Sequence, residues 1–217
     1  MESYRPRVIL SAAISLDGKL ATRTGDSKLS SQRDKIRVHK LRSRFDAILV
    51  GKNTVEIDDP LLAVQGIKGK NPVRVILDSR ATIRASSKIL RTCSKIPTII
   101  AVSKMAKKKN LEKLKKFPVV VKVCGNNKIN IKKLLKFLKE KKIKNLLVEG
   151  GGITNWTFVK ENLVDEVIIT ITPYIIGGNS STTLVDGNGF SIIAKSSRLR
   201  LKNVTRMKNE VVLHYEN

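Results

Sequence analysis

A carboxylate followed by three consecutive glycines is the part of this sequence that most directly suggests ligand chemistry. Glu149 precedes Gly150, Gly151 and Gly152, and an apolar run over 146–148 comes before it. Glycine backbone can lie close to a ligand and adopt dihedral angles that other residues resist. The first N–H groups of a following helix favour a phosphate. The alternative is a tight strand-to-helix turn whose glycines only permit close packing, because the run matches neither the GxGxxG fingerprint nor a P-loop.

Polar residues also follow three earlier apolar segments that read as strands. They occupy 15–31 after the first strand, 53–59 after the second, and Asp78 with Ser79 after the third. In open α/β sheets, ligands bind outside the carboxyl ends of the parallel strands. Four polar strand ends therefore predict a catalytic or binding crevice rather than four unrelated turns.

The net charge is the unusual global property of the chain. Forty-three basic residues against eighteen acidic ones give +25, a balance that suits nucleic-acid binding. Between residues 104 and 144, however, sixteen lysines stand against two glutamates with few aromatic residues for base stacking. We interpret them as the solvated faces of two amphipathic helices, 107–117 and 131–141. No nucleic-acid partner is therefore predicted, although the positive field would attract a phosphate-bearing substrate.

Cysteine and histidine usage excludes several kinds of site. Cys93 and Cys124 lack CxxC or metal-ligand spacing, which indicates buried thiols in a reducing compartment and hence a cytoplasmic protein. His39 and His214 lie far apart and are expected to be structural or surface residues, so no metal site is predicted. No apolar run reaches the ~18–20 residues of a membrane span, and the N-terminal segment lacks a signal peptide's apolar region. No membrane partner is expected.

Apolar runs alternate with amphipathic segments through the first three quarters of the chain. A helix over 32–44 is predicted to face inward through Ile36, Val38 and Leu41, and a polar turn is predicted over 52–62. The inward stripe of the second lysine-rich helix is Ile131, Leu134, Leu135 and Leu138. Strands are predicted over 7–14, 45–51, 72–79, 96–103, 117–124 and 146–148. This alternation predicts an α/β fold with a mostly parallel central sheet flanked by helices.

After Asp165 the pattern changes to strand-like segments without helices between them. Their stronger alternation predicts antiparallel strands, and 198–207 with 210–216 predicts a C-terminal hairpin. No internal repeat or linker interrupts the chain. A single domain over 1–217 is therefore predicted.

Seven stretches in order resemble the reductase of riboflavin biosynthesis, which follows a deaminase in bifunctional bacterial proteins and stands alone in archaea and fungi. They are SLDGKLAT (15–22), GDSKLSS (25–31), VHKLRSRFDAILVGKNTV (38–55), DDPLL (58–62), NPVRVILDS (71–79), VEGGG (148–152) and LVDEVIITITPYIIGG (163–178). The deaminase signature HxE…PCxxC is absent from the sequence, so the single-function form is the closer match. The resemblance implies a dihydrofolate-reductase-like fold.

The resemblance also implies the reaction. NADPH, with NADH as an alternative, would deliver a hydride to C1′ of the ribose of 2,5-diamino-6-ribosylamino-4(3H)-pyrimidinone 5′-phosphate, giving the ribitylamino product. Positioning would supply much of the catalysis, and a homodimer is implied. A dihydrofolate or pteridine-type reductase on the same fold is one alternative. A basic nucleic-acid-binding protein is another.

The resemblance assigns ligand contacts to individual positions. It implies no acid or base, only positioning by Glu149 and Asp58. The implied substrate contacts are Ser27, Arg42, Leu62 and Glu149. The implied cofactor contacts are Ala13, Thr54, Asp58, Ser79, Gly150, Gly151, Gly152, Ile153 and Thr154.

Several of these positions have plain structural alternatives. Two alternatives remain open. Arg42 is only a solvated helix residue in the first, and Asp58 only shapes the turn before Pro60 in the second. Asp17 with Gly18 is expected to form a turn, and Asp165 is expected to order one. Arg80 and Arg84 join Ser79 as candidates for a 2′-phosphate contact.

Two departures from the family pattern stand out. Gln65 replaces a basic residue that is common in relatives, and Ala63 replaces a threonine, so Lys19, Lys28 or Lys52 is a candidate to bind the substrate phosphate instead. Ile153 follows the glycines where a threonine is common, with Thr154 next. One hydroxyl contact to the cofactor would thus be shifted or lost.

Overall fold

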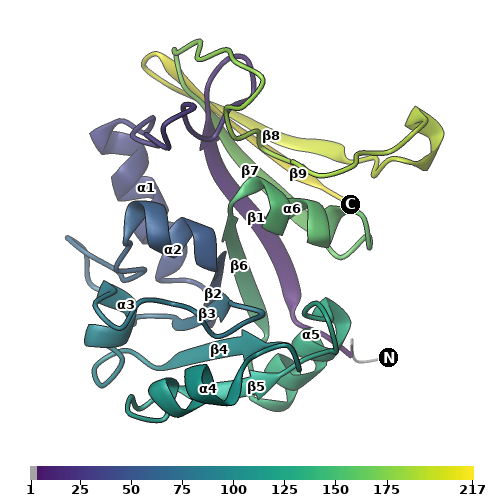
Figure 1. Ribbon diagram of the computed structural model, residues 1–217. Helices are drawn as coiled ribbons and strands as arrows, with labels where there is room; N and C mark the ends of the chain where they lie inside the picture. Colours follow the sequence, from purple (N-terminus) through teal and green to yellow (C-terminus); the bar gives the residue numbers. More distant parts are fainter. Residues whose placement is uncertain (1–3) are drawn as a thin grey trace. The chain divides into compact units, whose positions relative to one another are not determined.

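The computed structural model describes residues 4–217, and the first three residues of the predicted domain lie outside the described part. The described chain forms nine strands, six α-helices and one 3₁₀ helix (Figure 1). Its described residues divide into two compact units, the first made of 4–7 and 39–147 and the second of 8–38 and 148–217. The boundaries fall inside β1 (Arg7–Ile14), α1 (Gln32–Arg42) and β6 (Asn145–Gly150).

The first unit is built on four strands that pair in the order β5, β4, β3, β2, and all three pairings are parallel. The apolar, β-branched runs of the sequence account for this, since strands of a parallel sheet are buried on both faces. The elements of this unit are β2 (Ala47–Gly51), α2 (Lys52–Asp58), β3 (Val73–Leu77), α3 (Lys88–Arg91), β4 (Thr98–Val102), α4 (Lys108–Leu114), β5 (Val120–Val123) and α5 (Ile131–Glu140).

Helix α5 confirms the predicted inward stripe. Asn130 caps the helix by accepting the N–H of Lys133 at 2.9 Å, a typical way to satisfy a first-turn donor. The four stripe residues are fully buried, while Lys132, Lys133 and Lys136 are exposed. The lysine-rich sequence is therefore the outer face of an amphipathic helix in this unit.

The polar turn predicted over 52–62 is wrong in its first half, because residues 52–58 form α2. Only Val55 of this seven-residue helix is buried, so it shows no apolar periodicity. Lys52 and Glu56 form an i,i+4 ion pair of 2.7 Å on its surface. The helix ends at Asp59, which has a φ of 39° and directly precedes Pro60.

The inward face predicted for the first helix is also partly wrong. Ile36 is 42% exposed, and the buried residue of α1 is Asp34. Asp34 is held by hydrogen bonds from the Ser30 hydroxyl at 2.6 Å and the Thr170 hydroxyl at 2.7 Å, and by Arg37 Nε at 2.8 Å. A buried carboxylate satisfied in this way replaces the apolar contact that the sequence suggested.

The second unit holds β1, α6 (Gly152–Val159), β7 (Glu166–Ile171), the 3₁₀ helix η1 (Ile193–Lys195), β8 (Arg200–Met207) and β9 (Glu210–Glu216). Strand β7 pairs parallel with β1 and antiparallel with β9, and β9 pairs antiparallel with β8. The predicted C-terminal hairpin is confirmed. The prediction that every strand after Asp165 is antiparallel is wrong for the β1–β7 pairing.

Among the described residues, no helix is both long and apolar enough to span a membrane. Cys93 and Cys124 are free and buried, as predicted. Burial raises the pKa of the Cys124 thiol.

Candidate functional site

In the first unit, two predicted cofactor residues lie on α2, directly after β2. Thr54 is half-buried and Asp58, the last residue of the helix, is exposed. The backbone around them is fixed by neighbouring segments, because Arg84 Nη2 donates to Glu56 O at 2.8 Å and the N–H of Lys88 donates to Asp59 Oδ1 at 2.8 Å. Arg84, a candidate for a 2′-phosphate contact, thus uses one of its donors to hold α2.

Ser79 stands in a tightly held turn after β3. The buried carboxylate of Asp78 accepts the N–H of Ile83 at 2.7 Å, which closes the turn. The carbonyl of Ser79 accepts both the N–H of Ser103 at 3.0 Å and its hydroxyl at 2.8 Å. Asp78 therefore has a structural role, and Ser79 is presented on a rigid backbone.

The loop after α2 brings Leu62 and Arg42 together. Leu62 is buried with a φ of 49°, and Arg42 Nη1 donates to the carbonyl of the next residue, Ala63, at 3.3 Å. Arg42 is half-buried, so it is not simply a solvated helix residue. His39 Nδ1 contacts the same carbonyl at 3.1 Å.

Arg74 holds this loop through a hydrogen bond to its backbone. Sequence reasoning missed this residue. Its side chain is fully buried and makes six hydrogen bonds, all to carbonyl or hydroxyl oxygens. One of them reaches Leu61 O at 3.2 Å. Burial lowers the pKa of this guanidinium to about 10. An arginine inside a β-branched strand was the available signal, because a charge within a buried strand needs a specific set of partners.

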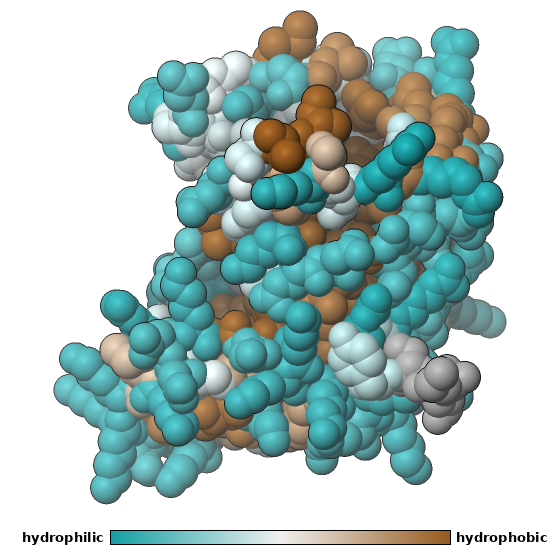
Figure 2. All heavy atoms as spheres, turned by 90° about the vertical axis from the view of Figure 1, so that its right-hand side faces the viewer, coloured by the Kyte–Doolittle hydropathy of each residue, from teal (hydrophilic) through white to brown (hydrophobic). Residues whose placement is uncertain are grey.

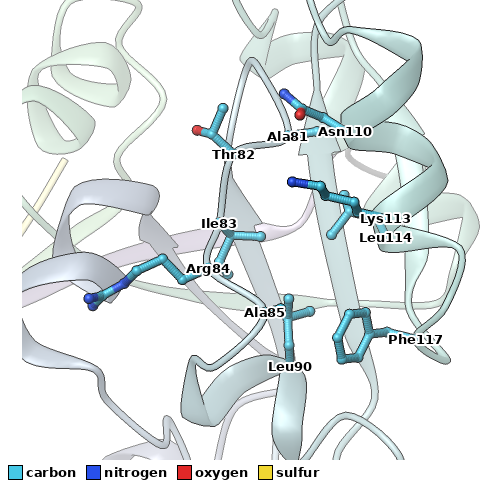
Figure 3. Close-up of a pocket in the computed structure, with 10 residues that line it drawn as sticks. All are labelled: Ala81, Thr82, Ile83, Arg84, Ala85, Leu90, Asn110, Lys113, Leu114 and Phe117. Atoms are coloured by element: carbon cyan, nitrogen blue, oxygen red, sulfur yellow. The ribbon is translucent and has the colours of Figure 1, made fainter.

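A cavity of about 370 Å³ opens in the first unit beside α4 (Figure 3). It is lined by apolar side chains that include Leu90, Leu114 and Phe117, and by the polar residues Thr82, Asn110 and Lys113. Arg84, a candidate for a 2′-phosphate contact, is among the lining residues, but the positions assigned to the substrate and to the other cofactor contacts are not. We therefore do not assign this cavity to the candidate site.

In the second unit, the glycine run forms the turn between β6 and α6. Gly150 and Gly151 have φ values of 60° and 84°, which only glycine adopts readily. At Gly152, a Cβ atom would lie 2.1 Å from Asp186 Oδ2 and 2.6 Å from Thr183 O. Packing against residues 183–186 thus explains Gly152, and Asp186, which sequence reasoning missed, lies against the first turn of α6.

Asn155, one turn into α6, carries a buried polar atom without a partner. Its Nδ2 donates to Leu184 O at 2.7 Å, but its Oδ1 has no hydrogen-bond partner among the described residues. Thr154 is buried beside it, whereas Ile153 is 62% exposed. The side chain that replaces the family's threonine therefore points away from the core of this unit.

The remaining predicted residues of this unit lie on β1, on β6 and in the loop before α1. Ala13 is half-buried near the end of β1, Glu149 is half-buried in β6, and Ser27 is exposed in the loop before α1. The structure places Glu149 and the glycine turn next to each other in the chain.

Asp17 lies in the turn that was expected of it, whereas Asp165 was expected to order a turn and instead contacts a residue of β1. Asp17 accepts the Ser15 hydroxyl at 2.6 Å and the N–H groups of Ile176 and Gly177 at 3.0 and 2.7 Å. These hydrogen bonds, led by that of Ser15, hold the pKa of its carboxyl well below the usual range. Asp165 Oδ2 accepts the N–H of Val8 at 2.7 Å.

The α/β architecture of this protein is similar to that of solved riboflavin biosynthesis proteins. The RibD protein of Acinetobacter baumannii superimposes with a TM-score of 0.84 at 27% identity, covering 100% of this chain and 59% of that one. The yeast riboflavin biosynthesis reductase Rib7 superimposes with a TM-score of 0.74 at 26% identity, covering 100% of this chain and 91% of that one. The fold is that of the RibD-type reductases.

Within the RibD-type reductases, the sequence identifies one family. The model of the RibD C-terminal domain matches residues 6–213, and the chain belongs to this family. A relative from Methanothermobacter thermautotrophicus, 42% identical, covers 97% of this chain and 98% of its own. A relative from Aquifex aeolicus, 39% identical, covers 98% and 96%. Both are named 2,5-diamino-6-ribosylamino-4(3H)-pyrimidinone 5′-phosphate reductase.

Proposed function

We propose that this protein reduces 2,5-diamino-6-ribosylamino-4(3H)-pyrimidinone 5′-phosphate to the ribitylamino product by hydride transfer to C1′, with NADPH as the donor. The observation that carries the proposal is the 42% identity, over nearly the whole of both chains, to a relative named for this substrate. The family model spans residues 6–213 in one match, which supports treating residues 1–217 as a single reductase domain.

The second unit offers a fitting place for the pyrophosphate of a nicotinamide cofactor. Gly152, Ile153 and Thr154 form the first turn of α6, where N–H groups have no acceptor within the helix. Such groups favour a phosphate, and the positive φ of Gly151 sets the backbone before them. When bound, the cofactor supplies the hydride. Gly150 to Thr154 would hold its pyrophosphate, while Thr54, Asp58, Ser79 and Ala13 would orient the rest.

Glu149, Arg42, Ser27 and Leu62 would bind the substrate. The carboxylate of Glu149 can accept hydrogen bonds from the pyrimidine amino groups or the sugar hydroxyls. Arg42, which donates to Ala63 O, can pair with a phosphate through its planar guanidinium. No side chain is assigned as an acid or base: the hydride would add to C1′ of the opened sugar imine while its nitrogen takes a proton from solvent, and orienting the sugar against the hydride donor would supply much of the rate.

The direct test follows NADPH oxidation with the pyrimidine phosphate, and separately with dihydrofolate, at equal concentrations. Turnover of the pyrimidine phosphate alone is expected. Turnover of dihydrofolate alone would instead identify a pteridine-type reductase. Repeating the assay with NADH tests the cofactor preference, because Ser79, Arg80 and Arg84 are the candidates to recognise a 2′-phosphate.

Two variants test the residue assignment. Glu149→Gln and Arg42→Ala are each expected to lower kcat/KM by about 10²-fold, corresponding to about 2.7 kcal/mol. Lys40→Ala is the matched control for Arg42, since Lys40 lies on the same helix and is exposed. Normal kinetics in both site variants would show that these positions are wrongly assigned.

We also propose a homodimer in the cytoplasm. Every residue of β8 before Met207 is exposed, and Leu201 and Val204 are 50% and 52% exposed. Figure 2 shows apolar atoms gathered on the upper part of one face, where Figure 1 draws the β8–β9 hairpin. An exposed strand of this kind is a template for pairing. Leu201→Lys is expected to yield monomers in light scattering, and a dimer unchanged by it would exclude this surface.

The two buried free thiols support a reducing compartment.

A further inference from the structure

Segment 182–187 is joined by hydrogen bonds both to helix α6 and to loop 15–31, and all of these residues belong to the second unit. The N–H of Leu184 donates to Gly18 O at 3.0 Å. The carbonyl of Leu184 accepts from Asn155 Nδ2 at 2.7 Å. The backbone of Leu184 thus connects the helix that follows the glycine turn with loop 15–31.

This segment packs closely on α6. The N–H of Asp186 donates to Gly152 O at 3.2 Å. Gly187 has a φ of 98°, and a Cβ atom there would lie 2.2 Å from Cδ1 of Trp156. The Trp156 ring also meets Phe190 edge to face, with 5.0 Å between the ring centroids. The segment is therefore fixed to the helix whose first turn would hold the cofactor pyrophosphate.

Backbone hydrogen bonds continue the connection along the loop. The N–H of Leu20 donates to Thr182 O at 2.8 Å. The N–H of Thr22 donates to Asp26 O at 3.0 Å, and the N–H of Asp26 donates to the Thr22 hydroxyl at 3.1 Å. Ser27, a proposed substrate contact, directly follows this closed turn. A shift of Thr182 is therefore passed to the backbone that carries Ser27.

Asn155 fills the space between the glycine turn and Leu184. It is 1% exposed, and its Oδ1 has no hydrogen-bond partner among the described residues. A Cβ atom at Gly150 would lie 2.3 Å from this Oδ1, so the amide lies directly against the turn. A buried acceptor without a partner is unfavourable for stability. The benefit of this amide therefore lies in the bond from Nδ2, which holds Leu184 at a fixed distance from the turn.

We propose that Asn155 is a positioning residue of the reduction, which through Leu184 fixes the glycine turn relative to the loop that carries Ser27. The proposal rests on the proposed function, because it gives the turn to the cofactor and the loop to the substrate. Hydride transfer needs reacting atoms about 3–3.5 Å apart and aligned, whereas each ligand can bind when the two segments are slightly misplaced. Loss of the connection is therefore expected to lower kcat more than it weakens binding of either ligand.

The kinetic test compares wild type with Asn155→Ala, which removes the amide and places a good helix former in α6. The kcat for the pyrimidine phosphate is expected to fall about tenfold, while KM and the Kd for NADPH change less than about threefold. Calorimetry is expected to show an unchanged number of NADPH molecules bound per chain, whereas partial unfolding would lower that number. A normal kcat, or a loss confined to KM, would overturn the proposal.

Thr157→Val is the matched control for Asn155→Ala. The Thr157 hydroxyl donates to Ile153 O within α6, at 2.9 Å, and not to segment 182–187. The control variant therefore loses a side-chain hydrogen bond of the same helix without changing the connection to the loop. It is expected to have the kcat, KM and NADPH affinity of wild type.

Thr183→Val weakens the connection from the side of the segment and leaves α6 intact. The Thr183 hydroxyl donates to Asp186 Oδ1 at 2.6 Å, which closes the turn over 183–186. This variant is expected to lower kcat about threefold with little change in KM, and it carries the test if Asn155→Ala folds poorly. In that case, a wild-type kcat in Thr183→Val would overturn the proposal.

Hydrogen exchange separates this inference from the proposed reaction, because it needs no ligand. The N–H groups of Leu20 and Leu184 donate across the connection, and their exchange is followed by NMR in the free protein. Asn155→Ala is expected to raise both exchange rates at least about tenfold over those of Thr157→Val. If the rates rise and no pyrimidine phosphate is turned over, only the proposed reaction fails. If turnover is normal and the rates equal those of the control, only the role of Asn155 fails.

Discussion

Arg74 is the buried cation on which the first unit depends, and replacing it with methionine is the sharpest test of that packing. The guanidinium donates to Leu61 O, Ile89 O and Ile96 O, and to the hydroxyls of Thr92 and Thr98. Methionine fills a similar volume without any donor. Arg74→Met therefore removes six hydrogen bonds while leaving the apolar packing of the side-chain stem largely in place.

Two opposing effects set the size of the change. Six hydrogen bonds at about 1 kcal/mol each contribute about 6 kcal/mol. Removing a buried charge recovers part of this, at most about 3 kcal/mol, given a pKa lowered to about 10. The hydrogen bonds win, because Leu61 O and Ile89 O would be left without this donor. We expect Arg74→Met to lower the free energy of unfolding by about 3 kcal/mol, in line with removal of one partner from other buried polar networks.

Urea denaturation followed by far-ultraviolet circular dichroism measures this change as a shift of the midpoint at constant slope. Hydrogen exchange in β3 and β4 localises it to the first unit. Arg91→Met is the matched control, because Arg91 is exposed, and it is expected to change stability by less than about 0.5 kcal/mol. A loss below about 1 kcal/mol for Arg74→Met would refute the reasoning.

Three further changes probe other parts of the fold. Leu134→Ala in the buried stripe of α5 is expected to cost about 2–5 kcal/mol in urea denaturation, whereas Lys136→Ala on its outer face should change little. Gly152→Ala is expected to cost about 1–3 kcal/mol, because its Cβ would overlap Thr183 O and Asp186; unchanged stability would contradict the close approach. Asp17, with its lowered pKa, contributes stability above about pH 4 that is lost as pH falls through the folded-state pKa. Asp17→Asn should flatten the pH dependence of the unfolding midpoint in that acidic range, and an unchanged slope would count against the role of Asp17.

The parts of the fold that sequence predicted are those with a local period. The stripe of α5 and the apolar strands β2, β3 and β4 have unambiguous patterns, and the structure confirms them. Helix α2 has one buried residue in seven, so its sequence lacks the apolar periodicity that would predict a helix. The parallel pairing of β7 with β1 depends on a partner about 157 residues away in the chain, as Ile9 with Glu166 shows. Alternation along a strand says nothing about the direction of its neighbour.

The candidate site was predictable to the extent that its residues follow strand ends. Ser79 follows β3, but Glu149 and Gly150, which were expected after the strand over 146–148, are the last two residues of β6. The supporting groups were not predictable, because their partners are distant in sequence. Gly152 meets Asp186 of a later loop, and Arg74 meets carbonyls from three segments. The contacts of Asn155 with Gly150 and Leu184 are visible only in three dimensions.

The central claim is reduction of the sugar rather than the pyrimidine ring, and isotope transfer tests it most directly. The protein is incubated with the pyrimidine phosphate and NADPH carrying deuterium at C4 of the nicotinamide, on the face that is transferred, and the product is analysed by NMR. Deuterium at C1′ of a ribityl chain, formed in step with NADPH oxidation, is the predicted result. Unreacted substrate, or deuterium on the heterocycle, would contradict the account.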